Sequence, residues 1–452
     1  MAFQTVRGTF DVLPDAHETG GASIAGSPAW RHVEAVVRET MRRFGFEEIR
    51  TPTLEPLELV ARGVGGTTDI VQKEMFTVSR GDEAYVLRPE VTAPVMRAYL
   101  QHRLDARGGA RRLYYLGPCF RAERPQKGRF RQFHQFGVEL LGADDPRADA
   151  ETIAVLRAVY DAFGLTGTRL RLNTLGDAAD RPRYREALRA YFAPYAADLS
   201  ETSRARLESN PLRLLDTKDE RERRLLEDAP RLSDYVGEAA RAHYEAVRGY
   251  LDDLGVPYAE DPLLVRGLDY YTRTVFELES DRLGAQAALG AGGRYDGLAE
   301  ALGSRQPVPA VGFAAGIERL LIALDAQGYA FPDAPRPDAF LATLGEAADR
   351  AGFALAQRLR AAGLAVDFAL AAPGAGRSLK RLLKAQIKAA YDVGARYAVL
   401  LGDNELAAGQ VLVRDLATRE QATVPLGALE AFLLGARPAP EAAANTAAHQ
   451  PL

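Results

Sequence analysis

The chain has 452 residues, and its 57 lysines and arginines nearly balance 61 aspartates and glutamates, for a formal net charge of -4. This length favours two or three domains, and the balanced charge requires any polyanionic partner to be met by local basic patches. One cysteine, Cys119, excludes an internal disulfide framework, and no histidine spacing is typical of a metal site. With no apolar run of about 18 residues and no signal-peptide core, we expect a cytoplasmic protein without a membrane span.

The N-terminal part predicts short elements in quick succession. Gly20–Pro28 ("GGASIAGSP") is rich in small residues and predicts a loop, and Trp30–Phe44 carries apolar residues at helical spacing, which predicts an amphipathic helix. The stretch "FEEIRTPTLEP" predicts a strand that ends at Pro52. The stretch "EAYVLRPEVTAPVMRAYL" then predicts a short strand followed by a helix that begins near Thr92, with Thr92 as its cap.

A basic stretch follows, "FRAERPQKGRFRQFHQFGVE" (Phe120–Glu139). Its "PQKG" turn predicts a hairpin, and the period of two along the second strand places six residues on one face: Arg129, Arg131, Phe133, Gln135, Gly137 and Glu139. Cations, an aromatic ring, an amide, a glycine and a carboxylate together indicate a floor for a polar ligand, with room for it at Gly137. Arginines at the hairpin tip suggest phosphate. A solvated basic hairpin is the alternative.

Beyond the hairpin the composition changes twice. Residues 177–258 are rich in Arg, Glu, Ala and Leu and predict a helical insertion, bracketed by the predicted strands "LRLNTLGD" and "PLLVRGLDYYTRTVFELES". The proline-rich residues 331–338 predict a linker between domains. Residues 339–435 alternate predicted strands and helices, as in a compact α/β domain, and residues 436–452 have little to bury and are expected to be disordered.

In the last domain, "GRSLKRLLKAQIKAAYDVGAR" holds six basic residues against one aspartate. Lys380, Lys384 and Lys388 are four residues apart and would line one side of a helix. Such a row could follow a nucleic-acid backbone, and the alternative is an ordinary solvated helix face.

Several of these stretches together resemble one family. "FRAE" with "RFRQF" has the form of motif 2 of the class II aminoacyl-tRNA synthetases, and "GFAAGIER" has the form of motif 3. "LVRGLDYYTRTVFE" and "GAGGRYDGL" resemble the two histidine-binding signatures of the histidyl-tRNA synthetases. Similar stretches run along the chain to about residue 435.

The resemblance implies an α+β fold. Residues 1–330 would form a catalytic domain with an antiparallel sheet flanked by helices and with the helical insertion, and residues 339–435 would read the anticodon. A homodimer would form through the region of "FGFEEIRTPTLEP". ATP, with Mg²⁺ on its β- and γ-phosphates, would react with histidine to give histidyl-adenylate and pyrophosphate, and the histidyl group would then move to tRNA. In that context Lys380, Lys384 and Lys388 would touch the tRNA.

The resemblance also assigns residues to each substrate. Arg121 would hold the α-phosphate and take part in catalysis, Glu123 and Arg129 would place the nucleotide, Phe133 would stack under adenine, and Arg319 would lie over adenine or on the γ-phosphate. The histidine pocket would consist of Glu90, Thr92, Gln135, Glu139, Tyr271 and Tyr295.

Arg266 corresponds to the family's catalytic arginine, near the α-phosphate and the substrate carboxylate. A structural ion pair between Arg266 and a neighbour such as Asp269 is the alternative.

The chain departs from the family pattern in three places: Val91 stands where many members have glycine, the 20–28 loop resembles an insertion, and the tail resembles an addition.

Two other functions are alternatives to histidyl-tRNA synthesis. A regulatory subunit of ATP phosphoribosyltransferase would share the fold and sense histidine, but such proteins tend to lose the motif 2 arginines and the C-terminal domain. A class II synthetase for another amino acid, such as proline or threonine, fits poorly with Gln135, Glu139 and "RGLDYYTR".

Overall fold

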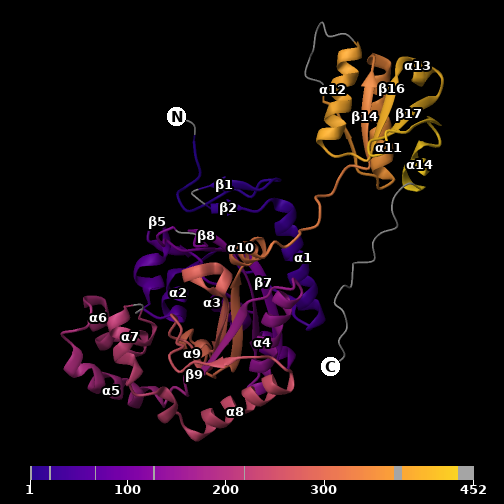
Figure 1. Ribbon diagram of the computed structural model, residues 1–452. Coiled ribbons are helices and arrows are strands. Elements are labelled where there is room, and N and C mark those ends of the chain that lie inside the picture. Colours follow the sequence, from indigo (N-terminus) through magenta and orange to yellow (C-terminus); the bar gives the residue numbers. More distant parts are fainter. Residues whose placement is uncertain are drawn as a thin grey trace. The chain divides into compact units, whose positions relative to one another are not determined.

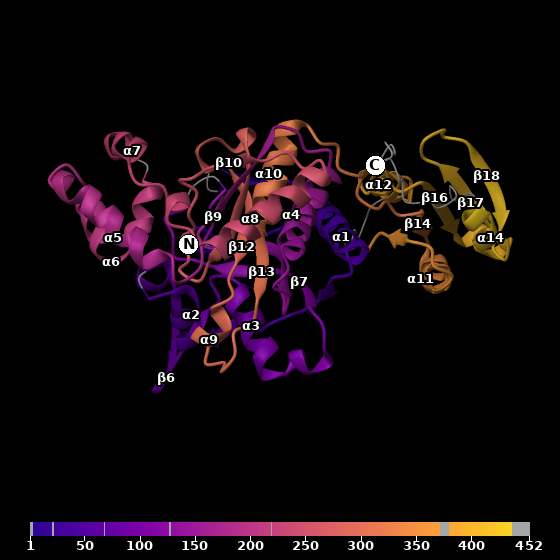
Figure 2. The same cartoon turned by 90° about the horizontal axis from the view of Figure 1, so that it is seen from below.

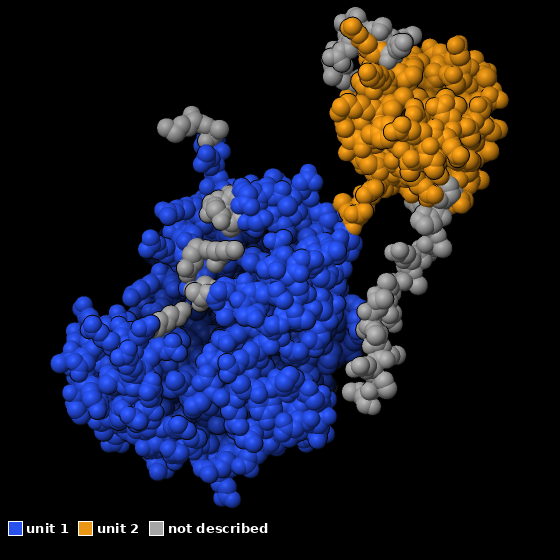
Figure 3. Space-filling view, in the orientation of Figure 1, with its two compact units in different colours: residues 1–332 blue, residues 333–452 orange. Residues whose placement is uncertain are grey.

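The computed structural model describes residues 3–19, 22–66, 68–125, 128–217, 219–370 and 379–435. The chain divides into two compact units, Met1–Pro332 and Asp333–Leu452 (Figure 3). The division falls inside the proline-rich segment at residues 331–338, and the predicted tail at residues 436–452 lies outside the described residues.

The larger unit is built on an eight-stranded sheet in the order β10-β9-β11-β12-β13-β8-β7-β3 (Figure 1). Its internal neighbours are antiparallel, and only the edge pairs β10–β9 and β3–β7 are parallel. The strands are β3 (Glu47–Glu48), β7 (Arg111–Phe120), β8 (Gln132–Leu141), β9 (Thr168–Thr174), β10 (Ala259–Glu260), β11 (Thr272–Ser280), β12 (Ala288–Arg294) and β13 (Ala310–Gly316). The predicted hairpin is confirmed, with Phe120 paired to Gln132.

Two hydrophobic cores lie on the two faces of this sheet, because successive strand residues point to opposite sides. Phe136 and Phe276 belong to the first core, and Tyr115 and Val275 belong to the second. The first core also takes residues from α1 (Ser27–Arg43), α4 (Pro146–Asp161), α8 (Glu238–Asp253) and α10 (Ile317–Gln327). The second takes residues from α3 (Thr92–Gln101), α5 (Arg181–Phe192) and α9 (Leu298–Ala301). The α+β class of a sheet flanked by helices is confirmed.

The stretch from 177 to 258 contains helices and no strand among its described residues. Helices α5, α6 (Glu201–Ser209) and α7 (Glu220–Glu227) lie together beside the sheet, and the long α8 returns the chain to it (Figures 1 and 2). The high content of Arg, Glu, Ala and Leu explains the helices, since these residues lose little side-chain freedom in a helix.

Two small sheets and helix α2 (Leu57–Val64) complete the unit: β1 (His17–Thr19) with β2 (Ala22–Ile24), and β4 (Leu54–Pro56), β6 (Glu83–Leu87) and β5 (Phe76–Arg80). The loop predicted at Gly20–Pro28 is therefore confirmed only at Ala25 and Gly26 among its described residues. Ala22–Ile24 pairs with β1, and α1 begins at Ser27 because Pro28 suits the first turn of a helix. The strand predicted in "FEEIRTPTLEP" is two short strands in different sheets, β3 and β4, on either side of Pro52.

The smaller unit holds a five-stranded sheet in the order β15-β14-β16-β17-β18. The first three strands are parallel, and β17 and β18 are antiparallel, so the predicted α/β alternation is confirmed. The elements are β14 (Ala339–Leu344), α11 (Glu346–Ala361), β15 (Val366–Phe368), α12 (Leu379–Asp392), β16 (Tyr397–Gly402), α13 (Asp403–Ala407), β17 (Gln410–Asp415), β18 (Gln421–Pro425) and α14 (Leu429–Gly435).

Candidate active site

One cavity of the larger unit gathers nearly every small-molecule residue predicted from the sequence. The central strands form its floor, and the start of α3 and the segment before β11 form its walls. Its lining includes Glu90, Thr92, Arg121, Glu123, Arg129, Phe133, Gln135, Arg266, Tyr271, Tyr295 and Arg319. Only Glu139 of that predicted set is absent from the lining, and its buried carboxyl group contacts two residues that do line the cavity.

One wall of the cavity is basic. Arg129 forms an ion pair with Glu123 at 2.8 Å, and the Arg121 guanidinium lies 5.3 Å from the centre of the Phe133 ring. Arg319 donates to the Ala288 carbonyl at 2.7 Å, and burial together with the charge of Arg129 lowers its pKa. Three guanidiniums so close to one another favour a ligand with several negative charges.

Arg266 lies next to this basic wall and is held by a carboxylate. It forms an ion pair with Glu277, not with Asp269, which instead accepts a hydrogen bond from Asn210 at 2.9 Å. Burial disfavours the charge of Arg266, yet its pKa stays above the usual value because Glu277 faces it. Burial likewise opposes charge on Glu277, whose pKa is nevertheless lowered, chiefly by Arg266. The pair thus keeps a permanent cation at the cavity wall.

Another part of the cavity, the acidic wall, is formed by two carboxyl groups, and Arg121 adjoins it because its Nε donates to the Pro89 carbonyl at 3.0 Å. Glu139 accepts a hydrogen bond from the Thr92 hydroxyl at 2.6 Å and another from the Tyr295 hydroxyl, and burial raises its pKa to about 8. Glu90 accepts from the backbone N–H groups of Thr92 and Ala93 at 2.8 and 2.9 Å, and burial raises its pKa as well. Neither carboxyl group forms an ion pair within 4 Å with a described residue, so the two suit a ligand that brings N–H groups or positive charge.

The predicted cap of α3 is therefore wrong. Thr92 uses its hydroxyl for Glu139, and the N-terminal N–H groups of the helix are satisfied by the side chain of Glu90. A carboxylate at this place is favoured by the helix dipole. Glu90 is thus fixed at the cavity wall by the helix that follows it.

Gln135 and the tyrosines close the acidic end. The Cys119 thiol donates to the Gln135 side-chain oxygen at 3.3 Å, and burial raises the pKa of this thiol to about 12, so it stays protonated. Tyr270 also lines the cavity, with its ring centre 4.6 Å from that of Tyr271 and 5.5 Å from that of Tyr295. Sequence reasoning missed Tyr270, although the doubled tyrosine in "RGLDYY" pointed to it.

Glycine serves this site at a different position from the one predicted. A Cβ at Gly137 would lie 2.4 Å from the Tyr115 hydroxyl and 2.3 Å from the Phe313 carbonyl, so protein atoms fill that space. The room for ligand expected at Gly137 is therefore absent. Gly312 lines the cavity instead, and a Cβ there would lie 1.9 Å from a carboxylate oxygen of Glu139.

The sequence analysis did not predict a contact between the Glu318 side chain on α10 and His134 on β8. Its carboxylate accepts from the backbone N–H of His134 at 2.9 Å and contacts the ring nitrogen Nδ1 of His134 at 2.9 Å. Glu318 lines the cavity and precedes Arg319, so this contact fixes the position from which Arg319 extends.

The predicted lysine row lies in the smaller unit. Lys384 is exposed, Lys388 pairs with Asp392 at 2.6 Å, and the side chain of Lys380 lies outside the described residues. Within the described part of the chain, no group of three or more His, Cys, Asp or Glu residues could hold a metal ion, and no helix is long and apolar enough to cross a membrane.

Comparisons with known proteins agree with this geometry. A family model described as "Histidyl-tRNA synthetase" matches residues 26–320, and one described as "Anticodon binding domain" matches residues 338–435. The histidine–tRNA ligases of Chlorobium luteolum and Synechocystis sp. are 47% and 48% identical, over 94% of this chain and over 96% and 91% of their own lengths. The crystal structure of apo S. aureus histidyl-tRNA synthetase is 37% identical, with a TM-score of 0.78, over 96% of this chain and 100% of that one. The chain belongs to the histidyl-tRNA synthetase family.

Proposed function

We propose that this chain is a histidine–tRNA ligase, which activates histidine with ATP and transfers the histidyl group to tRNA. The observation that carries the proposal is one cavity lined by both a basic and an acidic set of side chains, together with Arg266. ATP, which carries negative charge, would bind to the basic wall, and the ammonium and imidazole groups of histidine would bind to the acidic wall. The reacting carboxylate and α-phosphate would meet between them.

The basic wall would bind ATP as its Mg²⁺ complex, the metal arriving with the substrate. Arg121 would hold the α-phosphate, and Arg129, kept in place by Glu123, would contact the outer phosphates. Phe133 would stack under adenine while Arg319 covers it or reaches the γ-phosphate. Arg319 is well placed for this because its contact with the Ala288 carbonyl orients the guanidinium before ATP arrives.

The acidic wall would select histidine. Glu139 would accept a hydrogen bond from the imidazole, while Glu90, Thr92 and Gln135 would receive the α-ammonium group. The tyrosines would enclose the ring. An amino acid without a ring N–H would leave Glu139 with only its bonds from Thr92 and Tyr295 and would forgo the hydrogen bond that histidine adds.

Arg266 would act on the reacting centre. As histidine's carboxylate attacks the α-phosphorus, charge grows on the phosphate oxygens, and a guanidinium stabilises it without losing a proton. Glu277 would keep Arg266 aimed at that place. Arg121 would stabilise the same negative charge from the other side of the α-phosphate.

Transfer would then require tRNA at the same cavity. The smaller unit, residues 339–435, would bind the anticodon, and Lys380, Lys384 and Lys388 would contact the RNA backbone. Residues 1–330 would form the catalytic domain with its insertion at 177–258, and 331–338 the linker. We further propose a cytoplasmic homodimer formed through the region of β3 and β4, where Leu54 is exposed.

The alternative of a histidine-sensing regulatory subunit makes a different prediction. Histidine-dependent exchange of labelled pyrophosphate into ATP measures the activation step without tRNA. The ligase would show exchange that is lost in Arg266→Ala but not in Asp269→Asn, and a regulatory subunit would show none in any variant.

A further inference from the structure

A second arginine, Arg171 of β9, contacts the carboxylate that holds Arg266. Arg171 and Glu277 lie directly opposite each other in the pairing of β9 with β11. The Nη1 atom of Arg171 lies 3.8 Å from one carboxylate oxygen of Glu277, and the other oxygen pairs with Arg266. Glu277 is therefore held between two guanidiniums, one at each of its oxygens.

Arg171 is itself fixed by two further carboxylates. Its Nε donates to Asp261 at 2.7 Å, and its Nη1 donates to Glu279 at 2.7 Å. The Arg171 side chain is 25% exposed, so these contacts form a partly shielded network and not an isolated surface pair. A planar guanidinium that contacts three carboxylates cannot turn toward one without leaving another. Arg171 thus presents a fixed cation to Glu277.

The same strand also holds the backbone that leads to Arg266. Asp261, which pairs with Arg171, stands at the start of the segment 261–266. Two residues after Arg171 on β9, the Asn173 side chain donates to the Leu264 carbonyl at 3.0 Å. Strand β9 therefore holds this segment at two points before the chain reaches Arg266.

These contacts determine how Arg266 is presented to the active-site cavity. Arg266 donates to Glu277 through Nη1, and its Nε is buried without a hydrogen-bond partner among the described residues. Burial opposes charge on Glu277, yet its pKa is lowered by the charge of Arg266 and, to a smaller degree, by that of Arg171. Loss of Arg171 would free the carboxylate of Glu277 to turn, and Arg266 would turn with it.

We propose that Arg171 is a positioning residue for the activation of histidine, which fixes the direction of the Arg266 guanidinium through Glu277. The proposal rests on the function proposed above, in which Arg266 stabilises the charge that grows on the α-phosphate. Arg171 does not line the active-site cavity, so it would act through Glu277 and not by contact with ATP or histidine. The alternative is a purely structural role, in which Arg171 only joins β9 to β11.

The test compares Arg171→Gln with Arg169→Gln. Arg169 lies two residues earlier on β9 and so on the same face of the strand, but it is exposed. Histidine-dependent pyrophosphate exchange is measured over a range of histidine and ATP concentrations. Arg171→Gln should lower kcat about tenfold, because misplacing a catalytic group by about 1 Å can cost about a hundredfold in rate.

The KM values separate the two roles. In Arg171→Gln the KM for histidine and the KM for ATP should each stay within about twofold of the parent, because neither substrate loses a contact in the ground state. Arg171→Lys, which keeps the charge but has one nitrogen in place of the fork, should show a smaller decrease in kcat of the same kind. Arg169→Gln should keep the constants of the parent.

A double-mutant cycle measures whether the effect passes through Glu277. Glu277→Gln alone should lower kcat, because a neutral amide no longer pairs with Arg266. Adding Arg171→Gln to Glu277→Gln should lower kcat by less than about twofold further, since the link to Arg266 is already broken. A general loss of stability would instead add to the effect of Glu277→Gln.

Three results would overturn this role of Arg171. The first is a kcat in Arg171→Gln equal to that of Arg169→Gln, and the second is a further tenfold loss when Arg171→Gln is added to Glu277→Gln. The third is a higher KM for both substrates at unchanged kcat, which would assign Arg171 a structural role. No exchange by the parent protein would overturn the proposed function itself, and this role with it.

Discussion

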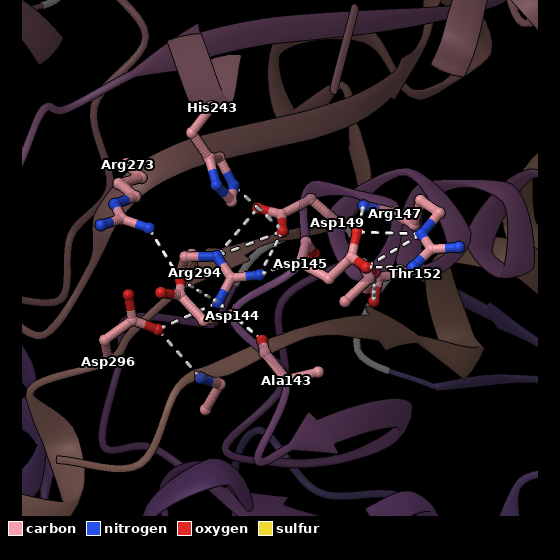
Figure 4. Close-up of polar contacts among 12 residues, drawn as sticks. Ala143, Asp144, Asp145, Arg147, Asp149, Thr152, His243, Arg273, Arg294 and Asp296 are labelled. Carbon is pink, nitrogen blue, oxygen red and sulfur yellow. Dashed lines mark hydrogen bonds and ion pairs between the residues drawn. The ribbon is translucent and has the colours of Figure 1, made fainter. Parts of the chain in front are cut away.

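Arg294 and Asp149 form an ion pair in which neither side chain is exposed to solvent (Figure 4). Asp149 lies on the buried face of α4, and Arg294 ends β12, directly before Tyr295 of the proposed histidine pocket. His243 of α8 contacts the same carboxylate at 3.3 Å. Burial opposes charge on Asp149, yet its pKa is lowered, with His243 and Arg294 as the causes.

Removing one partner of this pair should therefore be costly. Asp149→Ala would leave the buried guanidinium without its main counter-charge, and we expect a loss of about 3–5 kcal/mol in the free energy of unfolding. Arg157→Met is the control on the same helix, because its ion pair with Asp161 is partly exposed and should contribute less than about 1 kcal/mol. Urea unfolding measures both. Equal losses in the two variants would contradict this role for the pair.

The raised pKa of Glu139 predicts a pH dependence of stability. The folded protein binds a proton here up to about pH 8, whereas the unfolded chain releases it near pH 4.5. The free energy of unfolding should thus fall as pH rises between these values, by at most about 1.4 kcal/mol per pH unit from this group.

Glu139→Gln, which cannot ionise, should flatten this dependence while keeping an acceptor for the Thr92 hydroxyl. Urea unfolding at several pH values from 5 to 8, without histidine or ATP, measures the difference between the two proteins. Other groups that titrate in this range cancel in the comparison. An unchanged slope in Glu139→Gln would mean that the buried carboxyl group is already ionised at pH 5.

Gly312→Ala should damage the histidine site selectively. The added Cβ would displace the Glu139 carboxylate, so we expect the KM for histidine to rise by the equivalent of about 1–3 kcal/mol with a smaller change for ATP. Gly249→Ala on α8 is the control, because its Cβ would meet no atom within 4 Å. Steady-state pyrophosphate exchange gives both constants. Equal increases for the two substrates would argue against a local effect.

The lysine row predicts an effect on tRNA alone. The double variant Lys384→Glu with Lys388→Glu should have a higher KM for tRNA than the parent. This KM should rise less steeply with salt concentration than in the parent, while pyrophosphate exchange stays unchanged. Because Lys388 already pairs with Asp392, Lys384→Glu should have the larger single effect. Aminoacylation kinetics at two salt concentrations would measure this. An unchanged KM for tRNA would make the row a solvated helix face.

The sequence predicted which residues share the cavity but not how they are held. The period of two along β8 placed Phe133 and Gln135 on one face correctly, because a strand alternates regardless of its surroundings. The same period could not tell that Tyr115 fills the space at Gly137, since that depends on packing between strands. The pairing of Arg266 with Glu277 likewise follows from tertiary structure, so the sequence could name only the neighbouring Asp269 as an alternative partner.

Histidine-dependent exchange of labelled pyrophosphate into ATP, run beside the other amino acids, tests the central proposal most directly. A cavity with an acidic wall for imidazole and a basic wall for ATP predicts exchange with histidine alone. Exchange with a different amino acid, or no exchange from folded protein that still binds histidine, would contradict it.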